Sequence, residues 1–345
     1  MNGSKMLAKG ALVGMIIGAA SAVSLQAAHA EETLPGPLSG SDTALILGGT
    51  TEPTPSNAFA RAAENLFLHP LGFDDGATSS TVCDMIVTNP CAAPLQVLTT
   101  PELIQQGPST LTGADDVTLA VENEFNAHPG LFSADNPLTI FGYSQSATAD
   151  SIAMTQIHDY SMLHGDSIPL DSLHFVFIGD PSLEDTGIWA PSAADPSQSN
   201  LEYDLASLIG PEKTDHILTA LGIVANDGIG QQVLGNVTPT DLYPATIYTL
   251  EGDSVAQFQQ VFESSGLLGT IWHLFTTHVE YLGLTPEDIA AATTTTDGNL
   301  TLVDIPDTFN NAGAWLSAVF EHGAAGSGLL ESVWQSLELY LTNSF

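Results

Sequence analysis

A short apolar run that passes directly into a tight turn and then a helix restricts the fold of this chain more than any other feature. Residues 138–141 predict a strand, the turn Gly142-Tyr143-Ser144-Gln145-Ser146 follows at once, and residues 147–157 have helical character. This order is typical of a sharp elbow that holds a serine at the edge of a parallel sheet. Small residues are needed there because the backbone folds tightly around the serine. The elbow therefore predicts a sheet of parallel strands with helices packed against it.

Further apolar runs of strand length are spread along the chain, at residues 43–47, 95–98, 173–178, 245–250 and 300–305. Helical spacing of apolar residues lies between or after these runs, at residues 57–68, 114–125, 201–208, 215–224, 312–320 and 329–341. The threonine run at residues 293–296 is the one marked low-complexity tract. Strands that alternate with helices predict an α/β fold whose central, mostly parallel sheet is covered by helices on both faces.

One domain accounts for the predicted strands, and other segments are added to it. Residues 182–244 lie between two predicted strands, and an irregular segment of this length inside a domain is often a lid or a binding loop. We expect a signal peptide at 1–30, an N-terminal arm at 31–42, a domain at 43–306 with the insertion inside it, and a helical extension at 307–345.

The N-terminus has the pattern of an export signal. Lys5 and Lys9 precede an apolar run at residues 11–23, and Ala28-His29-Ala30 matches a cleavage site between small residues. The run is short for a membrane span, and an uncleaved anchor is the alternative. We therefore expect a protein that is secreted or held at the cell envelope.

Charge narrows the choice of partners. The chain has 40 acidic and four basic residues, a formal net charge of −36, and only Arg61 and Lys213 lie after the predicted signal. Phosphate contacts need clustered Lys and Arg, so the sequence argues against nucleic acid as a partner and disfavours docking to anionic lipid. No residue pattern indicates a metal ion or an organic cofactor, and the oligomeric state stays open.

Cys83 and Cys91 are the two cysteines of the chain. Export favours oxidation, so they predict one disulfide that closes a small surface loop. Metal binding would need further ligands nearby, and the sequence shows none.

Ser144 is the predicted nucleophile, and its partners should follow along the chain in the order acid, then histidine. Asp253 comes just after a predicted strand and is the favoured acid, while Asp180, which follows the preceding strand, is the alternative. His278 lies 25 residues after Asp253 and is the favoured base. The other histidines that follow the acid are His273 and His322.

An oxyanion hole needs two backbone N–H groups. One should come from Gln145, the residue after the nucleophile, and the other from the loop after the first core strand. Gly48 and Gly49 form a glycine-rich turn in that loop, and the Thr50 amide is the predicted second donor. On its own, the glycine pair indicates no more than the end of a strand.

Several motifs together resemble the PE-PPE domain of mycobacteria and their relatives, a cutinase-like group of serine hydrolases. The matching motifs, in the family's order between Thr43 and about Pro306, are Leu47-Gly48-Gly49-Thr50 with Pro53-Thr54-Pro55-Ser56, Gly142-Tyr143-Ser144-Gln145-Ser146-Ala147, Phe177-Ile178-Gly179-Asp180-Pro181, Asp253-Ser254-Val255-Ala256 and His278-Val279-Glu280-Tyr281. The resemblance implies an α/β-hydrolase fold of the cutinase-like type and a Ser/Asp/His triad at Ser144, Asp253 and His278.

The chain departs from the family's pattern at two places. Asp253-Ser254-Val255-Ala256-Gln257 lacks the second acid of the family's Asp-Gly-x-Ala-Asp, which leaves the proposed acid in place. Gly179-Asp180-Pro181 stands where the family often has Gly-Asn-Pro, and this keeps Asp180 open as a rival acid.

Together with the predicted export signal, the resemblance implies an exported esterase or lipase that hydrolyses lipid or other acyl esters through an acyl-enzyme. Two alternatives stay open. One is an acyltransferase that uses the same serine to move acyl groups onto envelope sugars such as trehalose. The other is a non-catalytic envelope-binding protein on a hydrolase scaffold, because a fold does not by itself determine a function.

Overall fold

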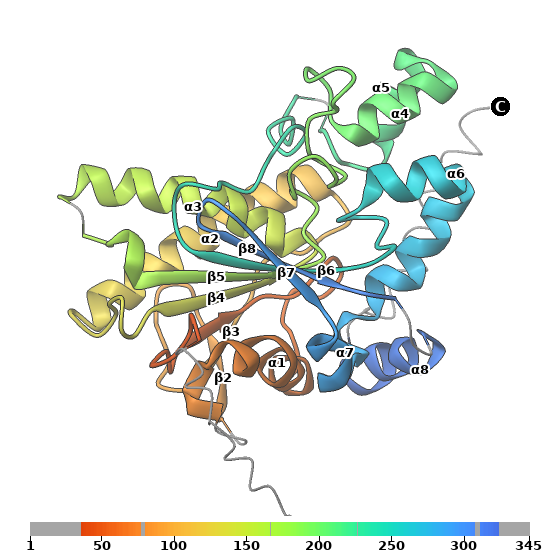
Figure 1. Ribbon diagram of the computed structural model, residues 1–345. Helices are drawn as coiled ribbons and strands as arrows, with labels where there is room; N and C mark the ends of the chain where they lie inside the picture. The colour runs from red at the N-terminus through yellow and green to blue at the C-terminus, as the bar shows by residue number, and fades with distance from the viewer. Residues whose placement is uncertain (1–35, 77–79, 166, 226, 308–310, 324–345) are drawn as a thin grey trace, which may run out of the picture. The chain divides into compact units, whose positions relative to one another are not determined.

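One sheet of eight strands organises the residues that the computed structural model describes, which are 36–76, 80–165, 167–225, 227–307 and 311–323 (Figure 1). Its order is β2-β3-β1-β4-β5-β6-β8-β7, and every neighbouring pair is parallel except β7 and β8. The strands are β1 Ala44–Ile46, β2 Val82–Met85, β3 Leu95–Leu98, β4 Leu138–Tyr143, β5 Leu173–Ile178, β6 Ala245–Leu250, β7 Thr293–Asp297 and β8 Leu300–Ile305.

The central strands are apolar because both faces of the sheet are covered. Every residue of β4, β5 and β6 is buried. Alternate side chains enter two separate cores, so that Phe175 and Phe177 join one cluster and Val176 and Ile178 join the other. Successive side chains of a strand point to opposite faces, which explains why these runs do not alternate between apolar and exposed polar positions.

Helices cover both faces. Figure 1 shows α2 and α3 on one side of the sheet and α1, α7 and α8 on the other. The helices are α1 Asn57–Ala63, α2 Gln106–Ala127, α3 Gln145–Leu163, α4 Asn200–Ile209, α5 Pro211–Ala220, α6 Phe258–Phe275, α7 Pro286–Ala290 and α8 Asn311–Leu316. Short 3-10 or π turns are η1 Glu64–Leu68, η2 His69–Leu71, η3 Phe73–Gly76, η4 Leu170–Ser172, η5 Thr277–Val279, η6 Tyr281–Gly283 and η7 Ser317–Glu321.

This architecture confirms the predicted α/β-hydrolase class, a mostly parallel sheet flanked by helices. The strand order also fixes where a site can form. From β1 the chain builds one side of the sheet with β3 and β2, and from β4 it builds the other side with β5, β6 and β8. In open parallel sheets, ligands bind at the carboxyl ends of the strands where the order reverses, which here lies between β1 and β4.

The insertion between β5 and β6 has a small core of its own. It contains α4 and α5, and a cluster centred on Trp189, Leu218, Ile223 and Val233 packs inside it. After the last strand, α8 and η7 together form the helix that was predicted at 312–320. The predicted helix at 329–341 and the predicted signal at 1–30 lie outside the described residues. None of the described helices is both long and apolar enough to cross a membrane.

Two strands were not predicted. The exposed threonine run at 293–296 forms most of β7, which is antiparallel at the edge of the sheet, and the partly buried β2 forms the other edge. Neither has the buried apolar run that marks a central strand. The predicted disulfide joins Cys83 of β2 to Cys91, with 6.4 Å between the two Cα atoms.

Candidate active site

Ser144 occupies a strained turn between β4 and α3. Its φ of 56° and ψ of −114° lie outside the regions that residues with a side chain favour. The Ser144 N–H donates to the Ile178 carbonyl of the neighbouring strand at 3.1 Å. The Ser146 hydroxyl accepts from the Tyr143 N–H at 2.8 Å and donates back to the Tyr143 carbonyl at 3.1 Å. Ser146, which stands where the common Gly-x-Ser-x-Gly elbow has its second glycine, therefore supplies a side chain that ties the elbow together.

Ser144, His278 and Asp253 lie in hydrogen-bonding contact, although they are far apart in the sequence. His278 Nε2 is 2.8 Å from Ser144 Oγ, and His278 Nδ1 is 2.8 and 3.0 Å from the two carboxyl oxygens of Asp253. Ser144 is partly exposed, whereas His278 and Asp253 are buried. With Nδ1–H directed at the carboxylate, Nε2 is left as the acceptor for the serine proton.

Asp253 is held in its ionised form. Burial raises the pKa of this carboxyl, but the nearby His278, the Val255 N–H at 2.8 Å and the Tyr281 hydroxyl at 2.7 Å more than offset burial and hold it below its ordinary value. An ionised carboxylate behind an imidazole stabilises the positive charge that the ring gains when it takes a proton.

Asp180, the rival acid, has other partners. Its Oδ1 accepts from the Ser182 N–H at 2.8 Å, and its Oδ2 accepts from the Thr238 hydroxyl at 2.6 Å. Burial raises the pKa of Asp180 to about 6 despite these two donors. The carboxyl group therefore ties the start of the insertion to its end.

Gly179, at the end of β5, leaves room for the imidazole. A Cβ atom at this position would lie 2.9 Å from His278 Cε1 and 3.1 Å from an Asp253 carboxyl oxygen. Its φ of +58° is also one that residues with a side chain rarely adopt.

Among the other histidines that follow the acid, His273 Nδ1 lies 3.0 Å from the Thr277 hydroxyl.

The segments that carry the two predicted oxyanion donors lie next to Ser144. Gln145 is the first residue of α3, so its N–H has no partner inside the helix. A Cβ atom built on Gly49 would lie 3.5 Å from Ser144 Cβ, which places the loop that carries Thr50 beside the serine. The Thr50 hydroxyl accepts from the Gln106 side chain at 2.9 Å, a contact that the sequence did not predict.

Two tyrosines around the site had no role in the sequence prediction, although both stand in the matched motifs. The Tyr143 ring stacks on His278 with centroids 5.5 Å apart, and its hydroxyl donates to the His278 carbonyl at 2.8 Å. Tyr281 contacts Asp253 as described above. The signal that could have found Tyr281 is its place three residues after the histidine. Within the described ranges, no three His, Cys, Asp or Glu side chains are grouped so as to bind a metal ion.

Comparison with known proteins agrees with the predicted family. The model of the PE-PPE domain matches residues 87–208, which include the elbow and Asp180 but not Asp253 or His278. The resemblance to that family is thus confirmed over a shorter range than the motifs suggested.

Two curated relatives come from Mycobacterium tuberculosis. "Uncharacterized PPE family protein PPE28" is 27% identical over 251 residues, which are 72% of this chain and 30% of the relative. "Esterase PE16" is 25% identical over 280 residues, which are 78% of this chain and 43% of the relative. The chain thus spans less than half the length of either relative.

Solved structures similar to this chain include a cutinase-like protein from Cryptococcus sp. It has 13% sequence identity and a TM-score of 0.35, and the match covers 72% of this chain and 98% of that one. A thermophilic esterase from Thermogutta terrifontis has 11% identity and a TM-score of 0.27, with 88% of this chain and 91% of that one covered.

Proposed function

We propose that this chain is an exported serine esterase or lipase that hydrolyses carboxylic esters through an acyl-enzyme. The observation that carries the proposal is the continuous hydrogen-bonded path from Ser144 Oγ through the His278 ring to Asp253. The name of the relative Esterase PE16 supports the same class of reaction. A serine on a strained elbow, with an imidazole within reach and a buried carboxylate behind it, has the geometry that activates a hydroxyl as a nucleophile.

In the first half of the reaction, Ser144 Oγ attacks the ester carbonyl carbon while His278 Nε2 takes the serine proton. The carbonyl oxygen becomes an oxyanion that accepts hydrogen bonds from the Gln145 and Thr50 amides. The positive N-terminus of α3 favours the same negative charge. The tetrahedral intermediate then collapses, the carbon–oxygen bond to the alcohol breaks, and His278 returns its proton to the departing oxygen.

In the second half, water replaces the alcohol. His278 takes a proton from the water, whose oxygen attacks the acyl carbon. Collapse of the second tetrahedral intermediate breaks the bond to Ser144, and the proton on His278 returns to the serine oxygen. The products are a carboxylic acid and the free enzyme, with Asp253 ionised throughout. We propose that the insertion at 182–244 covers the acyl-binding side of the site.

The test is hydrolysis of p-nitrophenyl esters with acyl chains from C2 to C16 by the protein without residues 1–30, and by its Ser144→Ala variant. We expect Ser144→Ala to lower kcat by at least about 10³-fold and to abolish labelling by a fluorophosphonate. Ser264→Ala, at an exposed serine of α6, should leave both unchanged. A folded wild type that neither hydrolyses any ester of the series nor labels would refute the proposal. Acyl transfer to added trehalose in preference to water would favour the acyltransferase.

A further inference from the structure

The Tyr281 hydroxyl lies between the end of β6 and the carboxylate of Asp253. It accepts a hydrogen bond from the Leu250 N–H at 2.9 Å and donates one to Asp253 Oδ2 at 2.7 Å. We propose that Tyr281 is a positioning residue, which fixes the orientation of the Asp253 carboxylate and through it the His278 ring. The catalytic consequence of this inference rests on the function proposed above.

The topology of the sheet explains why a hydroxyl is needed at this place. Pairing between β5 and β6 ends at Ile178 and Tyr248, and the Gly179 N–H still donates to the Tyr248 carbonyl at 3.2 Å. Leu250, two residues further along β6, faces the same side. There β5 has already turned away, so the Leu250 N–H has lost its strand neighbour. The Tyr281 hydroxyl takes the place of that neighbour, because a buried N–H without an acceptor is costly.

The direction of the two hydrogen bonds follows from this contact. A hydroxyl has one proton to donate. Because the Leu250 N–H can only donate, the Tyr281 oxygen accepts there, and its own proton is directed to Asp253 Oδ2. The strand end therefore sets which way the tyrosine hydroxyl points.

Besides His278, the Asp253 carboxylate has one hydrogen-bond donor on each of its two oxygens. The Val255 N–H holds Oδ1 at 2.8 Å, and the Tyr281 hydroxyl holds Oδ2 at 2.7 Å. Together they restrict the rotation of the carboxylate, whose two oxygens lie 2.8 and 3.0 Å from His278 Nδ1. Without Tyr281, the carboxylate keeps the Val255 N–H on Oδ1 but has lost the second donor on Oδ2, so its rotation about the Cβ–Cγ bond is less restricted.

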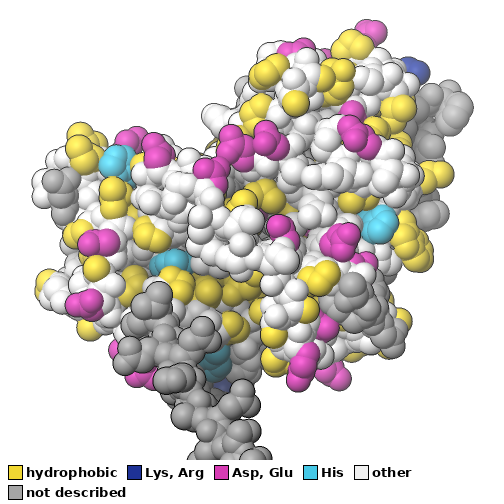
Figure 2. Space-filling model, viewed as in Figure 1, with side chains coloured by type: hydrophobic (Ala, Val, Ile, Leu, Met, Phe, Trp, Pro, Cys, Tyr) yellow, Lys and Arg dark blue, Asp and Glu magenta, His cyan; other side chains and the backbone are white. Residues whose placement is uncertain are grey.

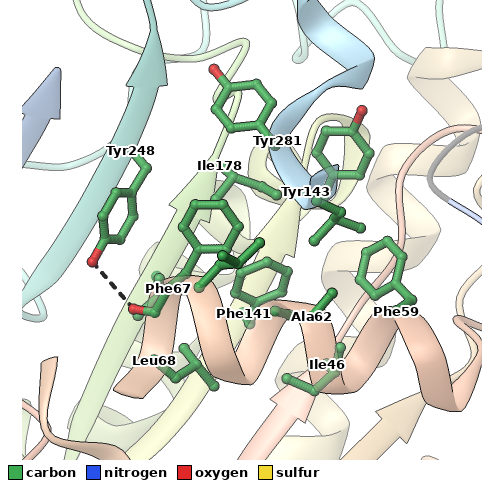
Figure 3. Packing of buried hydrophobic residues seen from close by; sticks show 14 of the residues in the cluster. Ile46, Phe59, Ala62, Phe67, Leu68, Phe141, Tyr143, Ile178, Tyr248 and Tyr281 are labelled. Atoms are coloured by element: carbon green, nitrogen blue, oxygen red, sulfur yellow. Dashed lines mark hydrogen bonds between the residues drawn. The ribbon is translucent and has the colours of Figure 1, made fainter. Parts of the chain in front are cut away.

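The surroundings keep the Tyr281 hydroxyl protonated. Tyr281 is fully buried, and burial together with the charge of Asp253 raises its pKa well above the ordinary value. The other titratable groups that act on this pair are His278 and Tyr143, and Glu52 acts in turn on Tyr143. Figure 3 shows the hydroxyls of Tyr281 and Tyr143 pointing to the same end of the apolar cluster, while that of Tyr248 points the other way, to Phe67.

The test compares Tyr281→Phe with Tyr248→Phe in the protein without residues 1–30. Both variants lose the hydroxyl of a buried tyrosine in the same cluster, but the Tyr248 hydroxyl donates to the Phe67 carbonyl rather than to Asp253. For Tyr281→Phe we expect kcat to fall by about tenfold to 100-fold, as for other small misplacements of catalytic groups, with KM little changed. Tyr248→Phe should keep the wild-type kcat.

A second readout separates positioning from loss of structure. A carboxylate with one donor fewer binds the imidazolium more strongly, so the acidic limb of kcat/KM should move to higher pH in Tyr281→Phe by about half to one unit. For the same reason the ¹H NMR resonance of the His278 Nδ1 proton should move downfield. If Tyr281 had only a structural role, the variant would have a smaller active fraction, but the pH of the acidic limb and the His278 Nδ1 proton resonance would stay as in the wild type.

An unmoved His278 Nδ1 resonance in folded Tyr281→Phe, or equal losses of kcat in both tyrosine variants, would overturn the inference. The resonance requires no turnover. If the wild type hydrolyses no ester, the proposed function fails, and a shifted resonance still supports the positioning role.

Discussion

Raising the pH from about 5 to about 8 should weaken the fold through Glu102, a buried carboxyl group near Gly113 of α2 and Asp150 of α3. Glu102 is 2% exposed, and its Oε1 accepts from the Thr100 hydroxyl at 2.8 Å. Burial raises the pKa of Glu102 from 4.5 to about 8, although the Thr100 hydroxyl lowers it. Between these two values the carboxyl group is protonated in the folded chain and ionised in the unfolded chain.

The sign follows from proton linkage. Folding takes up a proton over this window, so the free energy of unfolding falls as the pH rises, by about 1.4 kcal/mol per pH unit for one group. The contribution of this group to stability is fully present below pH 4.5, and it is lost as the pH rises towards about 8. From pH 5 to pH 8, we expect Glu102 alone to remove about 3 kcal/mol.

The measurement is urea unfolding of the wild type and Glu102→Gln at several pH values across this window. Gln imitates the protonated acid, so the variant should have a shallower fall of stability with pH, whatever its absolute stability. Glu184→Gln, at an exposed glutamate, should keep the wild-type slope. Parallel pH curves for wild type and Glu102→Gln would show that Glu102 ionises in the folded chain without penalty, and the reasoning would be refuted.

Two further predictions concern the site. Asp253→Asn should lower kcat by about 10³–10⁴-fold, whereas Asp180→Asn should mainly lower the free energy of unfolding, by about 1–2 kcal/mol, because its hydrogen bonds are weakened. Ester kinetics and thermal melts of the two variants distinguish these effects. The reverse pattern would make Asp180 the acid. Gly179→Ala should lower kcat by about 100-fold, because the added methyl group would displace His278. Gly130→Ala, also at a positive φ (+79°) but with no atom within 4 Å of the added Cβ, introduces backbone strain without the clash, so equal losses of kcat in both would contradict the steric explanation.

The sequence predicted the central strands well because their buried side chains leave short runs that are mostly apolar. The runs at 173–178, 245–250 and 300–305 match the bounds of β5, β6 and β8. Edge strands have no such pattern. In β7 all five residues are exposed, and its place in the sheet depends on pairing with β8, which no local signal records.

The candidate site was predictable as far as chain order and strand ends define it. The positions of Ser144, Asp253 and His278 follow from the motifs and from the rule that parallel strands end at one edge of the sheet. The side chains that hold them were not predictable. Tyr281 acts where β5 leaves β6, and Glu102 is buried by the packing of distant segments, so only the three-dimensional arrangement gives them their environment.

The contact of Asp180 with both ends of the insertion at 182–244 gives this insertion a closed base. The Ser182 N–H and the Thr238 hydroxyl meet on one carboxyl group, and the Thr238 N–H donates to the Ser182 carbonyl at 3.0 Å. The point where the chain leaves the sheet after β5 and the point where it returns towards β6 are therefore held together by these hydrogen bonds. The residues between Ser182 and Thr238 can therefore be replaced, by evolution or in the laboratory, without a change in the spacing between the ends of β5 and β6.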